Sequence, residues 1–141
     1  MAAGTRQELR PEVSYRSRTG AVLFATNLDR VAAFYTAVLG LLEVGRDEDH
    51  ILLESPGFQL VVHRVPHKGT PAREINATPR RASAPFKPVF FVPDFAQLRS
   101  VAESLGGSLD PADREWSFNG VPVCDGVDPE GNVIQFRVQQ G

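Results

Sequence analysis

Two polar side chains alternate with apolar ones near the end of the chain, in the run Val133–Val138. Successive side chains of a strand point to opposite faces, so Gln135 and Arg137 share one face with Val133, and Ile134, Phe136 and Val138 share the other. An amide both donates and accepts hydrogen bonds, and a guanidinium can bind a carboxylate through two parallel bonds. The pattern predicts a ligand-binding face. The alternatives are a structural bond from Gln135 to a neighbouring strand and a solvent-exposed rim position for Arg137.

His63 is the titratable residue best suited to move a proton near neutral pH. It lies in a predicted strand, Phe58–Val65, on the same face as Gln59 and Val61. Buried beside Gln135, it would act as a general base or would hydrogen-bond a ligand carbonyl group. A structural hydrogen bond at the end of the strand is the alternative.

Lys87, Trp116 and Phe118 are further candidates for ligand contacts. An inward-facing lysine would need an anion nearby, whereas a lysine at the start of a strand commonly points to water. Trp116 and Phe118 precede a predicted turn at Asn119-Gly120. They form either an aromatic wall of a binding site or part of the core.

The elements that position these residues occur twice in the same order. In the first half, a strand at 21–26 leads to a helix that begins after Asn27 and ends at Gly40. Three predicted strands follow. In the second half, a strand at 87–92 leads to a helix that is capped by Asp94, and three strands again follow it.

Each half alone would expose an apolar sheet face, so the two halves must pack together. The predicted fold class is α+β, with two βαβββ modules pairing into a curved mixed sheet around a cleft and helices outside. The predicted organisation is an N-terminal arm at 1–18, a first module at 19–66, a connector at 67–85 and a second module at 86–141. All four belong to one structural domain.

The connector is rich in proline and carries four basic residues, Lys68, Arg73, Arg80 and Arg81. Its lack of a sustained hydrophobic period indicates a loop. A solvated surface is the predicted role of the basic residues, and a flap that brings a cation over an anionic substrate is the alternative.

Composition excludes several classes of protein. The chain has 141 residues and a net charge of −2, which favours neither nucleic acid nor membrane as a partner. No stretch approaches the roughly 20 apolar residues of a membrane-spanning helix. The single cysteine, Cys124, excludes an internal disulfide and is typical of the cytoplasm, which is the predicted location.

The chain resembles the glyoxalase/bleomycin-resistance/extradiol-dioxygenase superfamily, also called the vicinal oxygen chelate superfamily. The resemblance covers about residues 20–139 and rests on three motifs: Asn27–Tyr35 running into Val38–Leu41, Val92-Pro-Asp94 followed by Gly106-Gly107, and Asp128–Asn132. It implies the paired-module fold and a homodimer. The superfamily includes isomerases, ring-cleaving dioxygenases and antibiotic-sequestering proteins, so the resemblance leaves the reaction open.

Most enzymes of this superfamily hold a divalent metal with His, Gln or Glu side chains. The matching positions in this chain are Gly20, Val61, Lys87 and Gln135, of which only Gln135 offers an oxygen ligand. The resemblance therefore implies a lost metal site, and no metal or other cofactor is predicted. The glyoxalase reaction needs a carboxylate to move a proton, and no Glu occupies either matching position, so lactoylglutathione isomerisation is not expected.

Three functions follow. The first is a metal-free protein that binds a small apolar or aromatic molecule in the cleft, through Trp116, Phe118 and Gln135. The second is a lyase or isomerase with an altered site, in which His63 is the base and Lys87 or Arg137 stabilises an oxyanion. The third is a dimeric interaction module without a small ligand.

Overall fold

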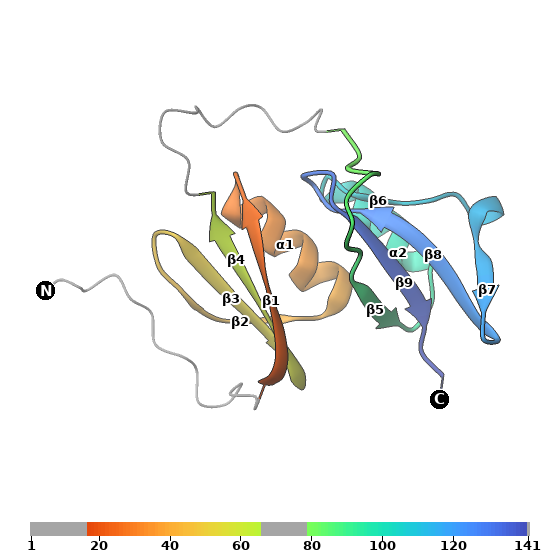
Figure 1. Cartoon of the computed structure of the whole chain (residues 1–141), viewed down its shortest axis with the longest axis horizontal. Helices are drawn as coiled ribbons and strands as arrows, with labels where there is room; N and C mark the ends of the chain where they lie inside the picture. Colours follow the sequence, from red (N-terminus) through yellow and green to blue (C-terminus); the bar gives the residue numbers. More distant parts are fainter. Residues whose placement is uncertain (1–16, 66–78, 141) are drawn as a thin grey trace, which may run out of the picture. The chain divides into compact units, whose positions relative to one another are not determined.

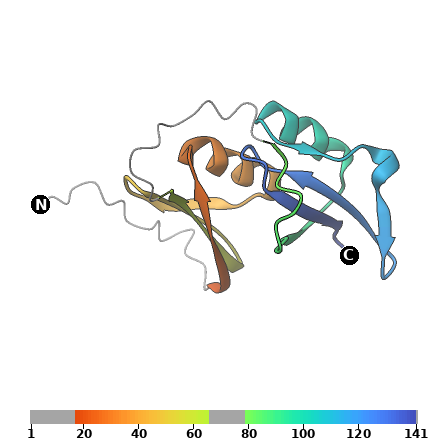
Figure 2. The ribbon, with the colours of Figure 1, turned by 45° about the horizontal axis from the view of Figure 1, so that its top comes forward.

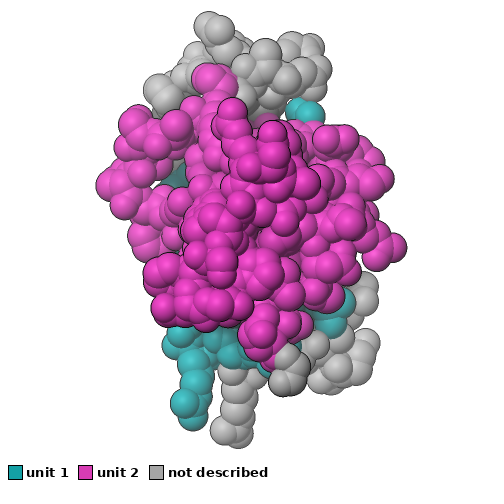
Figure 3. All heavy atoms as spheres, turned by 90° about the vertical axis from the view of Figure 1, so that its right-hand side faces the viewer, with its two compact units in different colours: residues 1–36, 40–74 teal, residues 37–39, 75–141 magenta. Residues whose placement is uncertain are grey.

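The structure is a computed structural model that describes residues 17–65 and 79–140. The chain divides into two compact units (Figure 3). Unit 1 holds residues 1–36 and 40–74, and unit 2 holds residues 37–39 and 75–141. Most of the predicted arm and part of the predicted connector lie outside the described residues, including Lys68 and Arg73.

Unit 1 contains one mixed sheet (Figure 1). Its elements are β1 (Ser17–Ala25), α1 (Leu28–Leu39), β2 (Leu42–Arg46), β3 (His50–Ser55) and β4 (Gly57–Arg64). The strand order is β1-β4-β3-β2, with β1 parallel to β4 and the other neighbours antiparallel. The sheet strand β1 begins at Ser17, so the predicted boundary of the arm falls two residues inside it.

Unit 2 repeats this topology. Its elements are β5 (Val89–Val92), α2 (Ala96–Ser104), β6 (Ser108–Leu109), a short 3-10 helix η2 (Ala112–Arg114), β7 (Trp116–Phe118), β8 (Val121–Val127) and β9 (Val133–Val138). The strand order is β5-β9-β8-β6, and β7 pairs with the outer part of β8. The strands β5 and β9 are parallel, as β1 and β4 are in unit 1. The α+β class and the repeated module are therefore confirmed.

The helix α1 begins and ends at its predicted cap residues, whereas α2 begins one residue later than predicted, with Phe95 rather than Asp94 as its N-cap. The Asn27 side chain accepts a hydrogen bond from the backbone N–H of Arg30 at 3.0 Å, and Gly40 ends α1 in the left-handed region with φ 71°. Asp94 accepts from the N–H of Gln97 at a longer 3.4 Å. The helix α2 is followed by Gly106, whose φ is 92°. The predicted cap signals are therefore confirmed for α1, while in α2 neither the N-cap Phe95 nor the C-cap Leu105 is a predicted cap residue.

The Asp128–Asn132 loop before β9 is held together by one buried carboxylate. Asp128 is 1% exposed and accepts hydrogen bonds from the N–H groups of Glu130 at 2.8 Å and Asn132 at 3.0 Å. Its second oxygen accepts from the Asn132 side-chain amide at 2.9 Å. These bonds fix the direction in which the chain enters β9, and with it the position of Gln135.

One face of each sheet is apolar and buried. In unit 1 this face contains Ile51 and Leu53 of β3 with Leu60 and Val62 of β4, and α1 lies beside this sheet (Figures 1 and 2). In unit 2 the equivalent face contains Cys124 of β8 with Ile134 and Phe136 of β9, all of which are buried. The polar candidates lie on the opposite face of each sheet, because they alternate with these residues along the strands.

Two further expectations concern membrane-spanning helices and the cleft between the two modules. No helix in the described part of the chain is long and apolar enough to span a membrane. The cleft between the two modules depends on their relative placement and stays a prediction.

Candidate functional site

The predicted ligand contacts of the second half gather on one face of the unit 2 sheet. Gln135 pairs with Val89 of β5 and Asp125 of β8, and Arg137 pairs with Phe91 and Val123. Trp116 in turn pairs with Val123. Because paired residues of neighbouring strands point to the same side, one surface carries all of these side chains. We call this surface the Gln135 face; it consists of Lys87, Val89, Phe91, Trp116, Phe118, Val123, Asp125, Gln135 and Arg137.

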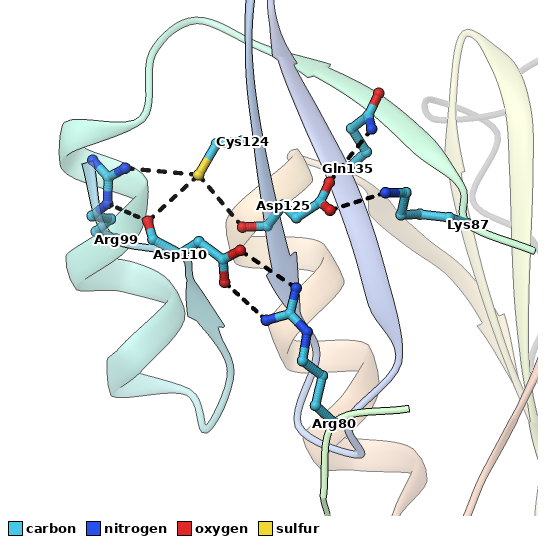
Figure 4. Close-up of polar contacts among 7 residues, drawn as sticks. All are labelled: Arg80, Lys87, Arg99, Asp110, Cys124, Asp125 and Gln135. Atoms are coloured by element: carbon cyan, nitrogen blue, oxygen red, sulfur yellow. Dashed lines mark hydrogen bonds and ion pairs between the residues drawn. The ribbon is translucent and has the colours of Figure 1, made fainter. Parts of the chain in front are cut away.

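A chain of polar contacts crosses the Gln135 face. The Lys87 Nζ atom lies 2.9 Å from Oδ2 of Asp125, and the Gln135 amide nitrogen donates to Oδ1 of Asp125 at 3.4 Å. Lys87 and Gln135 thus both point toward one carboxylate (Figure 4). The Gln135 oxygen accepts from Nε of Arg137 at 2.8 Å. Both ends of the Gln135 amide are therefore engaged.

The aromatic side chains of the Gln135 face are accessible to solvent. Phe91 is 54% exposed, Trp116 43% and Phe118 48%. The guanidinium of Arg137 lies over the Phe118 ring, with Cζ 4.9 Å from the ring centroid. Such exposure is not that of core residues, so the core alternative for Trp116 and Phe118 is wrong. The Asn119-Gly120 turn that joins their strand to β8 has positive φ at both residues, 53° and 75°, as the sequence predicted.

Four residues of this face were not predicted from the sequence, Val89, Phe91, Val123 and Asp125, and the one among them that makes polar contacts is Asp125. Its side chain is 15% exposed, and it connects Lys87 of the segment before β5 with Gln135 of β9. The signal was a charged residue within the otherwise apolar run Val121–Val127. The pairing also shows that Lys87 is held by an ion pair.

Unit 1 holds the predicted base, His63. Its Nδ1 atom lies 2.7 Å from the carbonyl oxygen of Arg64, and its ring contacts Phe24 and His50 with centroid distances of 5.3 and 4.3 Å. A carbonyl oxygen only accepts, so Nδ1 carries the proton and Nε2 keeps the lone pair in the neutral ring. His50 in turn donates to Asp47 at 2.9 Å, and this bond lowers the pKa of the Asp47 carboxyl.

Val61 lies between two polar clusters of the unit 1 sheet. On one side are His50 and His63; on the other, Glu54 accepts from the Gln59 side chain at 2.6 Å. Val61 pairs with Val22 as Gln135 pairs with Val89. Val61 is therefore the unit 1 equivalent of Gln135, in agreement with the alignment predicted for the two positions. His63 and Gln135 belong to different units, and their joint placement stays a prediction.

The four superfamily ligand positions do not fit a divalent metal. Gly20 has no side chain, Val61 has no donor atom, and the Lys87 cation is paired with Asp125. The oxygen of Gln135 accepts from a guanidinium, which opposes coordination of a second cation. Within residues 17–65 and 79–140, no three His, Cys, Asp or Glu side chains form a metal-binding group.

Cys124 lies on the opposite side of β8, toward α2. Its sulfur contacts Nη2 of Arg99 at 3.7 Å and the Asp110 carbonyl oxygen at 3.5 Å (Figure 4). Burial raises the pKa of the Cys124 thiol, and the nearby Arg99 cation only partly offsets this. Cys124 is therefore a protonated core thiol at neutral pH.

The described basic residues of the connector hold the chain to unit 2. Arg80 forms two contacts with the Asp110 carboxylate, at 2.8 and 3.4 Å. Arg81 donates from Nε to the Glu130 carbonyl oxygen at 3.1 Å and from its backbone N–H to that of Gly131 at 2.8 Å. The predicted solvated role is thus incomplete for these two arginines, because each has a specific partner.

Comparisons with known proteins agree with this architecture. The family described as "Glyoxalase-like domain" matches residues 20–137. Similar solved structures include a glyoxalase/bleomycin resistance protein/dioxygenase family enzyme from Burkholderia phytofirmans PsJN. That chain is 18% identical, with a TM-score of 0.65, over 87% of this chain and 98% of its own.

Two further similar structures are those of a resistance protein and of an enzyme. The bleomycin resistance determinant encoded on the transposon Tn5 is 18% identical, with a TM-score of 0.58, over 89% of this chain and 100% of its own. A lactoylglutathione lyase from Agrobacterium tumefaciens is 21% identical, with a TM-score of 0.56, over 92% and 96%. At these identities the likeness shows the fold alone. A search of curated proteins found no match.

Proposed function

The chain belongs to the glyoxalase-like domain family, and we propose that it is a metal-free protein that binds a small apolar or aromatic molecule on the Gln135 face. The observation that carries this proposal is the group of exposed aromatic residues, Phe91, Trp116 and Phe118, beside a preorganised polar chain. Aromatic side chains with a few fixed polar groups are typical of small-molecule sites. The loss of metal is supported by the chemistry of the four ligand positions.

The single tryptophan of the chain supplies a direct assay. Trp116 is on the proposed face, so a bound aromatic molecule should change its fluorescence. We expect at least one compound of a panel of aromatic molecules and peptide antibiotics to quench this signal saturably and to raise the Tm. Treatment with a chelator should leave the binding unchanged.

Substitutions locate the ligand. Replacing Phe118 with Ala removes a ring of the face and should weaken binding about tenfold, because one buried aromatic contact contributes on the order of 1 kcal/mol or more. Leu42→Ala is the control, since Leu42 is also an exposed apolar strand residue but belongs to unit 1. The proposal would be contradicted if no compound of the panel binds and the protein instead shows metal-dependent turnover of a substrate.

An enzyme with His63 as base is the second candidate. The supporting observation is the bond from Nδ1 to the Arg64 carbonyl oxygen, which orients the ring and leaves the Nε2 lone pair for proton abstraction. In this case His63→Ala should abolish turnover of a lyase or isomerase substrate. Unchanged turnover would remove His63 from the reaction.

A further inference from the structure

We infer that the ligand of the Gln135 face is an aromatic carboxylate, with Arg137 as its anchor. This inference rests on the proposed function and goes beyond it by fixing the charge and shape of the ligand. On the Gln135 face, the positive charge of Lys87 is compensated by the carboxylate of Asp125, which lies 2.9 Å from Nζ. Arg137 has no such partner, because no carboxylate of the described residues lies within 4.0 Å of it.

The contacts that Arg137 does make are neutral. Its Nε–H donates to an amide oxygen, and its Cζ atom lies over an aromatic ring. The residue is half-buried, so its charge is only partly solvated. A partly desolvated cation without a counterion favours the binding of an anion.

These contacts also orient the side chain. The Gln135 oxygen holds Nε, and the Phe118 ring supports the guanidinium at Cζ. The terminal nitrogens Nη1 and Nη2 make no hydrogen bond within residues 17–65 and 79–140. A fixed planar guanidinium with free terminal N–H groups matches the two oxygens of a carboxylate.

Aromatic surface flanks this anchor on both sides. In the row of paired residues across the sheet, Phe91 neighbours Arg137 directly, and Trp116 follows beyond the buried Val123. A ligand whose carboxylate meets Arg137 can therefore stack its ring on an exposed aromatic side chain. A cationic ligand would instead meet a face of net positive charge.

The test compares three probes that share one aromatic system: naphthoate, naphthamide and naphthylmethylammonium. Binding to the full chain is measured by the quenching of Trp116 fluorescence. We expect naphthoate to bind about 10- to 100-fold more tightly than the amide, as charge-assisted hydrogen bonds suggest. The ammonium compound should bind most weakly.

Variants assign the preference to Arg137. In Arg137→Gln, naphthoate and naphthamide should bind equally, while Arg137→Lys should keep part of the preference. Arg64→Gln is the control, because it removes the same charge from an exposed residue of unit 1. If either Gln variant fails to fold, as judged by circular dichroism, the comparison of probes on the unaltered chain still decides.

The outcomes separate the two claims. Equal binding of naphthoate and naphthamide to the unaltered chain overturns the inference and leaves the proposed function standing. A preference that survives in Arg137→Gln also overturns it, since the anchor would lie elsewhere. If none of the three probes changes Trp116 fluorescence, the inference fails, and the broader panel of aromatic molecules and peptide antibiotics decides on the proposed function.

Discussion

At the scale of single residues, the polar chemistry of unit 2 depends on cross-strand partners. Alternation along β9 was enough to predict that Gln135 and Arg137 share a face, because this follows from the geometry of one strand. The ion pair of Lys87 with Asp125 was not predictable in the same way. It depends on which strands are neighbours and in which register, and one strand's sequence does not contain that information.

Asp125→Asn tests the balance of charge on the Gln135 face. Removing the carboxylate releases the charge of Lys87, so the affinity for naphthoate should rise several-fold. The free energy of unfolding should fall by less than about 1 kcal/mol, because the pair is partly exposed to solvent. Trp116 fluorescence and urea unfolding measure the two effects. Asp113→Asn is the control; equal affinities of the two variants would contradict the expectation.

Cys124 predicts a loss of stability at alkaline pH. Burial raises the pKa of its thiol in the folded chain, so the thiol ionises first in the unfolded state as the pH rises. The resulting stabilisation is complete below the unfolded pKa and disappears as the pH passes through the folded pKa. Between about pH 7 and about pH 10, the Tm of the unaltered chain should therefore fall more than that of Cys124→Ala. Parallel curves would contradict this account.

At the scale of elements, the two units are related by register as well as by order. Val22 pairs with Val61, and Val89 pairs with Gln135. In the sequence, Val22 precedes Asn27 by the same number of residues as Val89 precedes Asp94. The caps of α1 and the turns were predictable because each depends on a few neighbouring residues. The start of β1 was not predictable, because Ser17 belongs to the strand through its pairing with Gly57 of β4, which is distant in sequence.

The side-chain hydrogen bonds at the start of the two helices should differ in how much they stabilise the fold. The Asn27 bond is 3.0 Å long and the Asp94 bond 3.4 Å, which is near the limit of a useful hydrogen bond. We expect Asn27→Ala to lower the free energy of unfolding by about 1 kcal/mol and Asp94→Ala by clearly less. Urea unfolding of both variants measures the difference. A larger loss of unfolding free energy in Asp94→Ala than in Asn27→Ala would show that hydrogen-bond length does not determine which residue stabilises its helix more.

A side chain at Gly20, the position that the resemblance matches to the first superfamily ligand, would meet the neighbouring strand. A Cβ atom added there would lie 2.8 Å from the carbonyl oxygen of Gln59, which belongs to the paired strand β4. Because a backbone atom cannot move aside cheaply, Gly20→Ala should cost about 1–3 kcal/mol of stability. Gly20→His should cost at least as much without creating a metal site. Full stability of Gly20→Ala in urea would remove this steric explanation.

At the scale of the whole molecule, edge strands favour self-association. The strands β1 and β5 are both sheet edges, and each exposes a valine and a phenylalanine at equivalent positions: Val22 and Phe24, Val89 and Phe91. Exposed apolar edges of this kind invite pairing with another chain. The sequence contained the edge residues, but it could not show what covers them, because that depends on contacts between units or between chains.

We therefore predict a homodimer, as the superfamily resemblance also implies. Light scattering at micromolar concentration should give about twice the chain mass of 15.4 kDa. Val22→Lys places a charge on the edge strand β1 and should shift the mass toward that of one chain, while circular dichroism stays unchanged. Ser104→Lys, on the exposed surface of α2, is the control and should remain dimeric. A monomeric mass for the unaltered chain would contradict the prediction, and a dimeric Val22→Lys would move the interface away from β1.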